Sequence, residues 1–305
     1  MYFDLAKELN TQQCTAAATL HGPLLVIAGA GSGKTRMLTY RIANMLQNGI
    51  AEESILALTF TNKAAKEMGE RIRSLTNLPL KKLTTTTFHS FGMGVLKQYI
   101  QHLGFKNNFT IYDTNDRMAL IKEVIQNLDY VVETFDLYEL STLFSDIKTK
   151  RKVFGANASD KIRNLYNEYE KHLKAYNAVD FDDLIMKPLD LFEKKPEVLQ
   201  ALRKRYTHIL VDEFQDTSLS QYRMVELLAQ ESRNLCVVGD DDQSIYSWRG
   251  ANYENLVMFE RDFPERLEVK LERNYRSTGT ILEAANSLIV NNQIRKEKKL
   301  WTDSG

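Results

Sequence analysis

Short apolar runs recur along the chain and are separated by longer amphipathic stretches. Most of the runs are continuously hydrophobic instead of alternating, which is typical of strands buried on both faces of a parallel sheet. Helical spacing of apolar residues fills the intervals, for example over 63–75 and 220–229. This alternation predicts an α/β fold in which helices flank a parallel sheet. The five strand candidates are 24–28, 55–60, 208–212, 235–239 and 267–271.

The stretch 91–204 has a different character, because it contains few β-rich runs. Long amphipathic segments dominate it, at 116–128, 159–175 and 196–206. The pattern predicts an all-helical domain inserted between the second and third strands of the sheet. A final helix is expected over 277–291.

Composition limits the classes of protein to which the chain can belong, but it does not select a function. The 305 residues carry 40 Lys and Arg against 40 Asp and Glu, so the net charge is zero and any basic surface must be local. Two cysteines lack metal-ligand spacing and the five histidines form no paired motif, which predicts a reducing compartment and no zinc site. No targeting segment or membrane-length apolar run is present, so we expect a soluble cytoplasmic protein without a membrane partner. The basic run 295–299 is interpreted as a solvated helix end, with a nucleic-acid patch as the alternative.

The stretch AGAGSGKT at 28–35 fits the phosphate-loop template G-x-x-x-x-G-K-[ST]. A strand candidate precedes it and helical spacing follows it, a context that disfavours a glycine-rich turn without function. Glycines allow a tight turn whose N–H groups face a phosphate at the helix N-terminus. Lys34 is then expected to reach the β- and γ-phosphates of ATP, and the Thr35 hydroxyl to bind Mg²⁺. The predicted nucleotide-binding residues here are Ala28, Gly29, Ala30, Gly31, Ser32, Gly33, Lys34 and Thr35.

A later strand candidate ends in two carboxylates, Asp212 and Glu213. The carboxyl edge of a parallel sheet is where α/β folds bind ligands. Asp212 is expected to hold Mg²⁺, and Glu213 to orient and deprotonate the attacking water. Acidic residues at such a position also cap helices, but the upstream phosphate loop favours the catalytic interpretation.

Two further segments carry weaker signals. After the strand candidate at 235–239, the amide of Gln243 is suited to sense a γ-phosphate or to position water. Trp248 beside Arg249 forms either a stacking platform for single-stranded bases or a core tryptophan with a paired arginine, and the residues alone favour neither. Arg276 is able to stabilise charge on a transferred phosphoryl group, although composition alone favours an ordinary surface arginine.

These segments resemble, in order, the motifs of superfamily 1 DNA helicases of the Rep/UvrD/PcrA group, and those of Rep most closely. The TFTNKAA block and the block around Gln243 are specific to this group, whereas AGAGSGKT alone is not. The resemblance covers nearly the whole chain, which corresponds to the N-terminal half of such a helicase. The matching blocks are 9–13, 28–35, 58–65, 86–90, 211–218, 237–251 and 271–277.

The resemblance implies an ATP-dependent 3′–5′ DNA helicase that acts on single-stranded DNA and on junctions of single- and double-stranded DNA. The pathway, whether replication or repair, and the oligomeric state stay open. The resemblance also implies that Gln13 reads the adenine edge, and that Arg36 and Tyr275 sandwich the adenine ring. Gln243 and Arg276 are expected at the γ-phosphate. The implied DNA contacts are Phe60, Tyr246 and Trp248 at the bases, Arg249 as a coupling residue, and Asn62, Thr87 and His89 along the groove.

By the same resemblance, 1–90 and 205–274 form the first motor domain, 91–204 the inserted helical domain, and 275–305 the truncated start of a second motor domain. Family members are longer and carry two further motifs in that second domain. We therefore expect a fragment that binds ATP more weakly than a full-length relative and does not unwind duplex. The alternative is a nucleotide- and DNA-binding module without turnover, whereas a small-molecule kinase leaves the TFTNKAA block unexplained. The block 180–183 also resembles part of the helical insertion, without an assigned mechanism.

Overall fold

The computed structural model describes residues 3–155, 160–243, 254–292 and 296–304. By its internal contacts the chain divides into two compact units. The first unit consists of residues 1–88 and 200–305, and the second unit of residues 89–199. The strand-rich ends of the chain therefore fold together, and the strand-poor middle forms a unit of its own.

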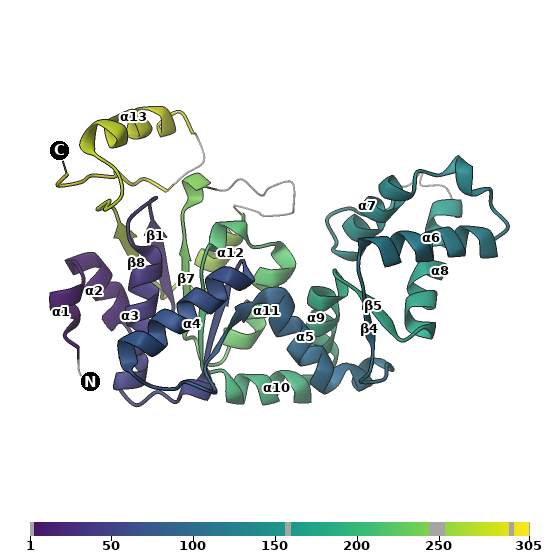
Figure 1. The fold of residues 1–305 in the computed structure, drawn as a ribbon, viewed down its shortest axis with the longest axis horizontal. Coiled ribbons are helices and arrows are strands. Elements are labelled where there is room, and N and C mark those ends of the chain that lie inside the picture. The colour runs from purple at the N-terminus through teal and green to yellow at the C-terminus, as the bar shows by residue number, and fades with distance from the viewer. Residues whose placement is uncertain (1–2, 156–159, 244–253, 293–295, 305) are drawn as a thin grey trace. The chain divides into compact units, whose positions relative to one another are not determined.

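A six-stranded parallel sheet forms the centre of the first unit (Figure 1). Its strands are β1 (Leu24–Ala28), β2 (Ile55–Thr59), β3 (Thr84–Thr87), β6 (His208–Val211), β7 (Leu235–Gly239) and β8 (Leu267–Leu271). They run in the order β3-β2-β6-β7-β1-β8, and every neighbouring pair is parallel. This order places β7 between β1 and β6, so the loops after these three strands leave the same edge side by side. The predicted α/β fold with a parallel sheet is confirmed, but the pattern misses β3, whose four threonines give no apolar run.

Helices cover both faces of this sheet, which explains why its central strands are buried whichever face a residue points to. The helices of the unit are α1 (Leu5–Glu8), α2 (Thr11–Ala18), α3 (Lys34–Gln47), α4 (Asn62–Thr76), α11 (Leu219–Ala229), α12 (Glu254–Asp262) and α13 (Gly279–Ile289). Leu24, Val26 and Leu210 join a core with Met37 of α3 and Ile72 of α4. On the other side α11 packs against β6 and α12 (Figure 1). No helix in the described part of the chain is long and apolar enough to cross a bilayer.

The second unit is mostly helical and contains one small sheet. Its elements are β4 (Thr110–Tyr112), α6 (Thr114–Asn127), α7 (Leu137–Lys148), α8 (Asp160–Ala175), β5 (Ala178–Asp180) and α9 (Asp183–Lys194), while α5 (Phe88–Tyr99) and α10 (Pro196–Arg205) cross its boundaries. Strands β4 and β5 pair in parallel, with Ile111 opposite Val179. Ile121, Phe144 and Tyr169 belong to the core of α6, α7 and α8. The prediction of an all-helical insertion is therefore wrong in this detail, because strands of three residues are too short to give a recognisable run.

Candidate active site

The phosphate-loop candidate joins β1 to α3 and bends through two residues with positive φ. Gly31 has φ +67° and Gly33 has φ +81°, a region that residues with a Cβ adopt only with strain. A Cβ on Gly33 would lie 2.5 Å from Gln13 Nε2, and a Cβ on Gly31 would lie 2.7 Å from Asn274 Nδ2. Two amide side chains therefore press directly on the backbone of the turn. Ala28, at the first position of the template, is the last residue of β1.

Both amides hold carbonyl groups of the loop. Gln13 Nε2 donates to the Ser32 carbonyl at 2.8 Å, and Asn274 Nδ2 donates to the Ala30 carbonyl at 2.6 Å. Asn274 Oδ1 also accepts from the backbone N–H of Arg276 at 2.7 Å, and the Arg276 side chain is exposed. Both amide residues are buried, so water competes little for these bonds. Sequence reasoning missed Asn274, although it stands inside the LERNYRS block, and the role of Gln13 at an adenine stays a prediction.

The carboxylates after β6 face the loop lysine. Lys34 Nζ lies 2.9 Å from Glu213 Oε2, so the phosphate loop and the acidic segment meet in an ion pair. Glu213 has φ +50°, which is uncommon for a residue with a side chain, and its N–H donates to Asp212 Oδ1 at 3.0 Å. Gln215 Nε2 donates to the same Glu213 oxygen at 2.8 Å. The structure thus brings the predicted loop lysine and the two predicted carboxylates together.

The acidic segment after β6 carries the carboxyl groups of Asp212, Glu213 and Asp216, and Lys34 offsets only part of their negative charge. Burial raises the pKa of Asp212 to about 6, and the Glu213 charge adds to the rise while Lys34 opposes it. The pKa of Asp216 is also raised to about 6, first by burial and then by Glu213. Both carboxyl groups therefore hold a proton part of the time near neutral pH, and a cation bound beside either group would displace its proton.

Gln215 links the acidic segment to the loop after β7. Its Oε1 accepts from the Asp240 N–H at 3.0 Å, while its Nε2 is bound to Glu213. Asp240 Oδ2 in turn accepts from Gln243 Nε2 at 2.5 Å. A continuous series of polar contacts therefore runs from Lys34 to Gln243. Sequence reasoning missed Gln215, although this amide stands two residues after the predicted base.

A cavity of about 360 Å³ opens at this edge of the sheet, within the first unit. Near it, the Oγ of Ser32 is buried and has no hydrogen-bond partner in the described part of the chain. The cavity therefore collects carboxylates, hydroxyls and an amide beside a glycine-rich turn, a donor set suited to a phosphate and a hard cation. The predicted site residues that line it are Thr35, Phe60, Asp212, Glu213 and Gln243.

The two residues expected to sandwich an adenine both contact the N-terminal segment. Arg36 Nη2 donates to the Glu8 carbonyl at 2.8 Å, and its guanidinium carbon lies 5.3 Å from the centre of the Tyr40 ring. Tyr275 is 53% exposed, and its hydroxyl accepts from Asn10 Nδ2 at 2.8 Å. Their joint role at a base stays a prediction.

The predicted DNA contacts fall in separate places. Asn62 follows β2 and Thr87 ends β3, where Thr87 Oγ1 donates to Asn62 Oδ1 at 3.3 Å. In the second unit, His89 stacks on Phe181, with 4.3 Å between ring centres and 24° between ring planes. Phe181 is 56% exposed, and sequence reasoning missed it as a site residue although it belongs to the block 180–183. The residues that lie outside the described part of the chain are Tyr246, Trp248 and Arg249.

Residues 296–304, here called the C-terminal segment, run beside the end of β8 and reach the phosphate loop. The Asn274 N–H donates to the Trp301 carbonyl at 2.7 Å. The Leu300 side chain fills the space beside Gly29, where a Cβ would overlap its Cδ2. The conformation of the loop therefore depends on this segment as well as on α2.

Lys298 shows that the basic run is not a solvated helix end. The preceding helix ends at Ile289, and the Lys298 side chain is only 2% exposed. Its Nζ lies 3.0 Å from Asp240 Oδ1 and 2.7 Å from Asp242 Oδ2, and Asp241 completes the cluster. The ammonium group of Lys298 contacts all three aspartates and offsets one of their three negative charges, so the four side chains form an ion-pair cluster.

The profile of the UvrD/REP helicase N-terminal domain matches residues 9–264. The chain belongs to the UvrD/REP helicase family. Its curated relatives include the ATP-dependent DNA helicase PcrA of Staphylococcus aureus strain Mu50, which is 45% identical over 98% of this chain and 42% of the relative. PcrA of Staphylococcus epidermidis strain ATCC 12228 is 44% identical with the same coverage. The chain thus spans about two fifths of the length of the curated relatives it matches.

Membership in the UvrD/REP helicase family confirms the resemblance inferred from the ordered blocks. The relatives named above are PcrA proteins, so the closer likeness to Rep stays a prediction. The family profile begins at residue 9 and includes the phosphate loop, the acidic segment and Gln243. These are the segments that the structure assembles around one cavity.

Proposed function

We propose that this chain is the ATP-hydrolysing motor portion of an ATP-dependent DNA helicase that moves 3′–5′ along single-stranded DNA. The observation that carries the proposal is the 2.9 Å ion pair between Lys34 and Glu213, at a cavity that Thr35 and Asp212 also line. The two halves of this site are 179 residues apart in sequence, and neither alone implies hydrolysis. The names of the PcrA relatives support the activity, and the polarity rests on the family resemblance.

The side chains of the site divide the chemistry among them. Lys34 and the N–H groups of the loop would hold the phosphates, so that Lys34 exchanges its Glu213 partner for phosphate oxygens. Glu213, released from the lysine, would then orient and deprotonate the attacking water. Gln243 would hydrogen-bond to the γ-phosphate from the loop after β7. The further proposed nucleotide contacts are Gln13, Arg36, Tyr275 and Arg276.

The residues present fit ATP and Mg²⁺. The Thr35 hydroxyl and the Asp212 carboxylate would hold the cation, which neutralises phosphate charge when bound. Burial raises the pKa of Asp212, and a cation held beside this carboxylate would lower it. The buried Ser32 Oγ, without a partner in the part of the chain that is described, offers one more donor beside the glycines.

Single-stranded DNA, including junctions with duplex, is the proposed substrate. Since the net charge is zero, affinity must come from base stacking and a few local phosphate contacts. Phe181 stacks on His89 with more than half of its surface exposed, which leaves ring area for a base. Burial lowers the pKa of His89, although Asp182 raises it, so the paired ring is neutral at pH 7. The other proposed contacts are Phe60, Asn62, Thr87, Tyr246, Trp248 and Arg249.

Steady-state ATP hydrolysis with and without single-stranded DNA, together with calorimetry of ATP binding, tests the proposal. Lys34→Met removes a charge-assisted phosphate contact of about 1.5–3 kcal/mol, so ATP affinity should fall roughly 10- to 150-fold. Lys66→Met is the control, because this lysine of α4 has a side chain 78% exposed. Equal ATP affinity in the Lys34 variant and the wild type would refute the site.

A nucleotide- and DNA-binding module without turnover is the second candidate. The chain spans about two fifths of the length of its curated relatives. In this proposal residues 1–90 and 205–274 form one motor domain, 91–204 the inserted domain, and 275–305 the start of a second motor domain. ATP binding without DNA-stimulated hydrolysis would select this candidate.

A further inference from the structure

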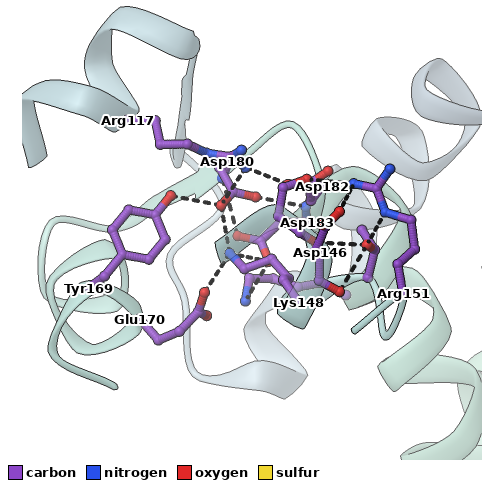
Figure 2. A network of polar contacts seen from close by, with 12 residues as sticks. Arg117, Asp146, Lys148, Arg151, Tyr169, Glu170, Asp180, Asp182 and Asp183 are labelled. Carbon is purple, nitrogen blue, oxygen red and sulfur yellow. Dashed lines mark hydrogen bonds and ion pairs between the residues drawn. The ribbon is translucent and has the colours of Figure 1, made fainter. Parts of the chain in front are cut away.

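The acidic block at 180–183 surrounds a buried lysine (Figure 2). Lys148, the last residue of α7, has a side chain only 5% exposed, and its Nζ lies 2.6 Å from Asp180 Oδ2 and 3.2 Å from Asp183 Oδ1. Glu170 of α8 supplies a third carboxylate oxygen at 2.6 Å. An ammonium group buried to this extent requires such compensation.

Asp180 is held from a second side by neutral and cationic donors. The Tyr169 hydroxyl donates to Asp180 Oδ2 at 2.8 Å, and Arg117 Nη2 lies 3.0 Å from the same oxygen (Figure 2). Burial raises the pKa of Asp180, but Lys148 and Arg117 more than offset this and hold the pKa below its ordinary value. The carboxylate is therefore charged, and its position is fixed by several directional contacts.

The same two aspartates close a tight turn between β5 and α9. The Asp180 N–H donates to Asp183 Oδ2 at 3.1 Å, and the Asp183 N–H donates to Asp180 Oδ1 at 2.9 Å. Two residues stand between these reciprocal bonds, Phe181 and Asp182. Lys148 contacts both carboxylates that close the turn, so it is linked through them to the backbone that carries Phe181. Lys187 Nζ also lies 3.2 Å from Asp183 Oδ1.

We propose that Lys148, Asp180 and Asp183 are positioning residues for single-stranded DNA, whose ion network holds the turn so that Phe181, stacked on His89, presents its exposed face to a base. This inference rests on the proposed function. A well-packed apolar cluster is able to stabilise a domain as well as a buried ion network does. The ionic contacts differ in being directional, which is what the presentation of a ring at a fixed angle requires.

A double-mutant cycle separates positioning from stability, with affinity for a labelled oligonucleotide measured by fluorescence anisotropy. Phe181→Ala should weaken binding roughly 5- to 150-fold, as for the loss of one base–aromatic stack. Lys148→Met should weaken binding by a similar factor. In the Phe181→Ala background, Lys148→Met should cause no further loss, because the two residues act through one contact.

Separate controls test whether the loss of affinity comes from the lost positive charge or from misfolding. Lys171→Met also removes one positive charge of the second unit, from a side chain that is 69% exposed, and should change affinity little. Asp183→Asn keeps the size of the side chain and provides a second variant if Lys148→Met does not fold, as judged by circular dichroism. With five histidines, selective labelling resolves the His89 ring protons, and their upfield NMR shift from Phe181 should decrease in the folded Lys148 or Asp183 variant.

The inference is overturned if the folded Lys148 and Asp183 variants bind DNA with wild-type affinity, or if the losses from Lys148→Met and Phe181→Ala add. Both results would leave the proposed function intact. In contrast, a wild-type chain that binds no single-stranded DNA, or a Phe181→Ala variant with unchanged affinity, refutes the assignment of DNA binding to this unit and the inference with it.

Discussion

Asp212 lowers the stability of the first unit at neutral pH, so its replacement by asparagine should stabilise the fold. Asp212→Asn keeps the size of the side chain and the acceptor Oδ1, which binds the Glu213 N–H at 3.0 Å. It removes a buried negative charge that lies beside a second carboxylate. A gain in stability on loss of a catalytic group is the usual sign of a site shaped for function.

The size of the effect follows from the pKa of Asp212, which burial and Glu213 raise from 3.8 to about 6. A tenfold change in proton affinity is about 1.4 kcal/mol, so ionising Asp212 costs roughly 3 kcal/mol more in the folded chain than in the unfolded chain. Between these two pKa values the folded state binds more protons, and the wild type loses stability as the pH rises through them. The variant should therefore be more stable by roughly 3 kcal/mol at about pH 8, and by close to zero at about pH 4.

Urea denaturation followed by tryptophan fluorescence measures this difference, because Trp248 and Trp301 both belong to the first unit. His208 has the opposite effect on the pH dependence of stability. Burial lowers its pKa to about 4, so stability falls as the pH drops below 6.5. That contribution is common to both chains and cancels in their difference. A difference that is equal at the two pH values, or a variant that is less stable than the wild type at about pH 8, would refute the reasoning.

Three other substitutions test the site. Gly33→Ala forces a Cβ to 2.5 Å from Gln13 Nε2 at φ +81°, and calorimetry should show ATP affinity lowered on the order of tenfold or more. Asn274→Ala removes the bond to the loop and two turn bonds, each contributing about 0.5–1.5 kcal/mol, so urea denaturation should show a first unit less stable by roughly 1.5–4.5 kcal/mol. Trp248→Ala should weaken oligonucleotide binding in anisotropy by roughly 5- to 150-fold with ATP binding unchanged, and wild-type affinity would instead favour a core tryptophan.

The sequence was sufficient for features that depend on local pattern. Apolar runs predicted five of the six strands, and four of these, β1, β2, β6 and β7, are buried at every residue. The phosphate loop and the two carboxylates were predicted from strand–turn–helix context. In contrast, β3 consists of threonines at the sheet edge, and its identity depends on pairing with β2.

The residues that the sequence did not reveal act across long chain separations. Asn274 bonds to the carbonyl of a residue 244 positions earlier, and no local spacing signals such a contact. Gln215 bridges two loops that become neighbours only because β6 and β7 pair. Lys298 looked like part of a solvated basic run, and three aspartates that precede it by more than fifty residues determine its burial. Charge runs are therefore interpretable only when their partners in space are known.

Contacts of the C-terminal segment couple it mechanically to the phosphate loop. The Trp301 carbonyl accepts a hydrogen bond from the Asn274 N–H, and the Asn274 side chain donates one to the Ala30 carbonyl. Leu300 packs directly on Gly29, so the segment contacts the loop once directly and once through Asn274. The curvature of the loop is thus expected to respond to tension on the segment, and a single-molecule pulling trace recorded from that end should change when nucleotide is added.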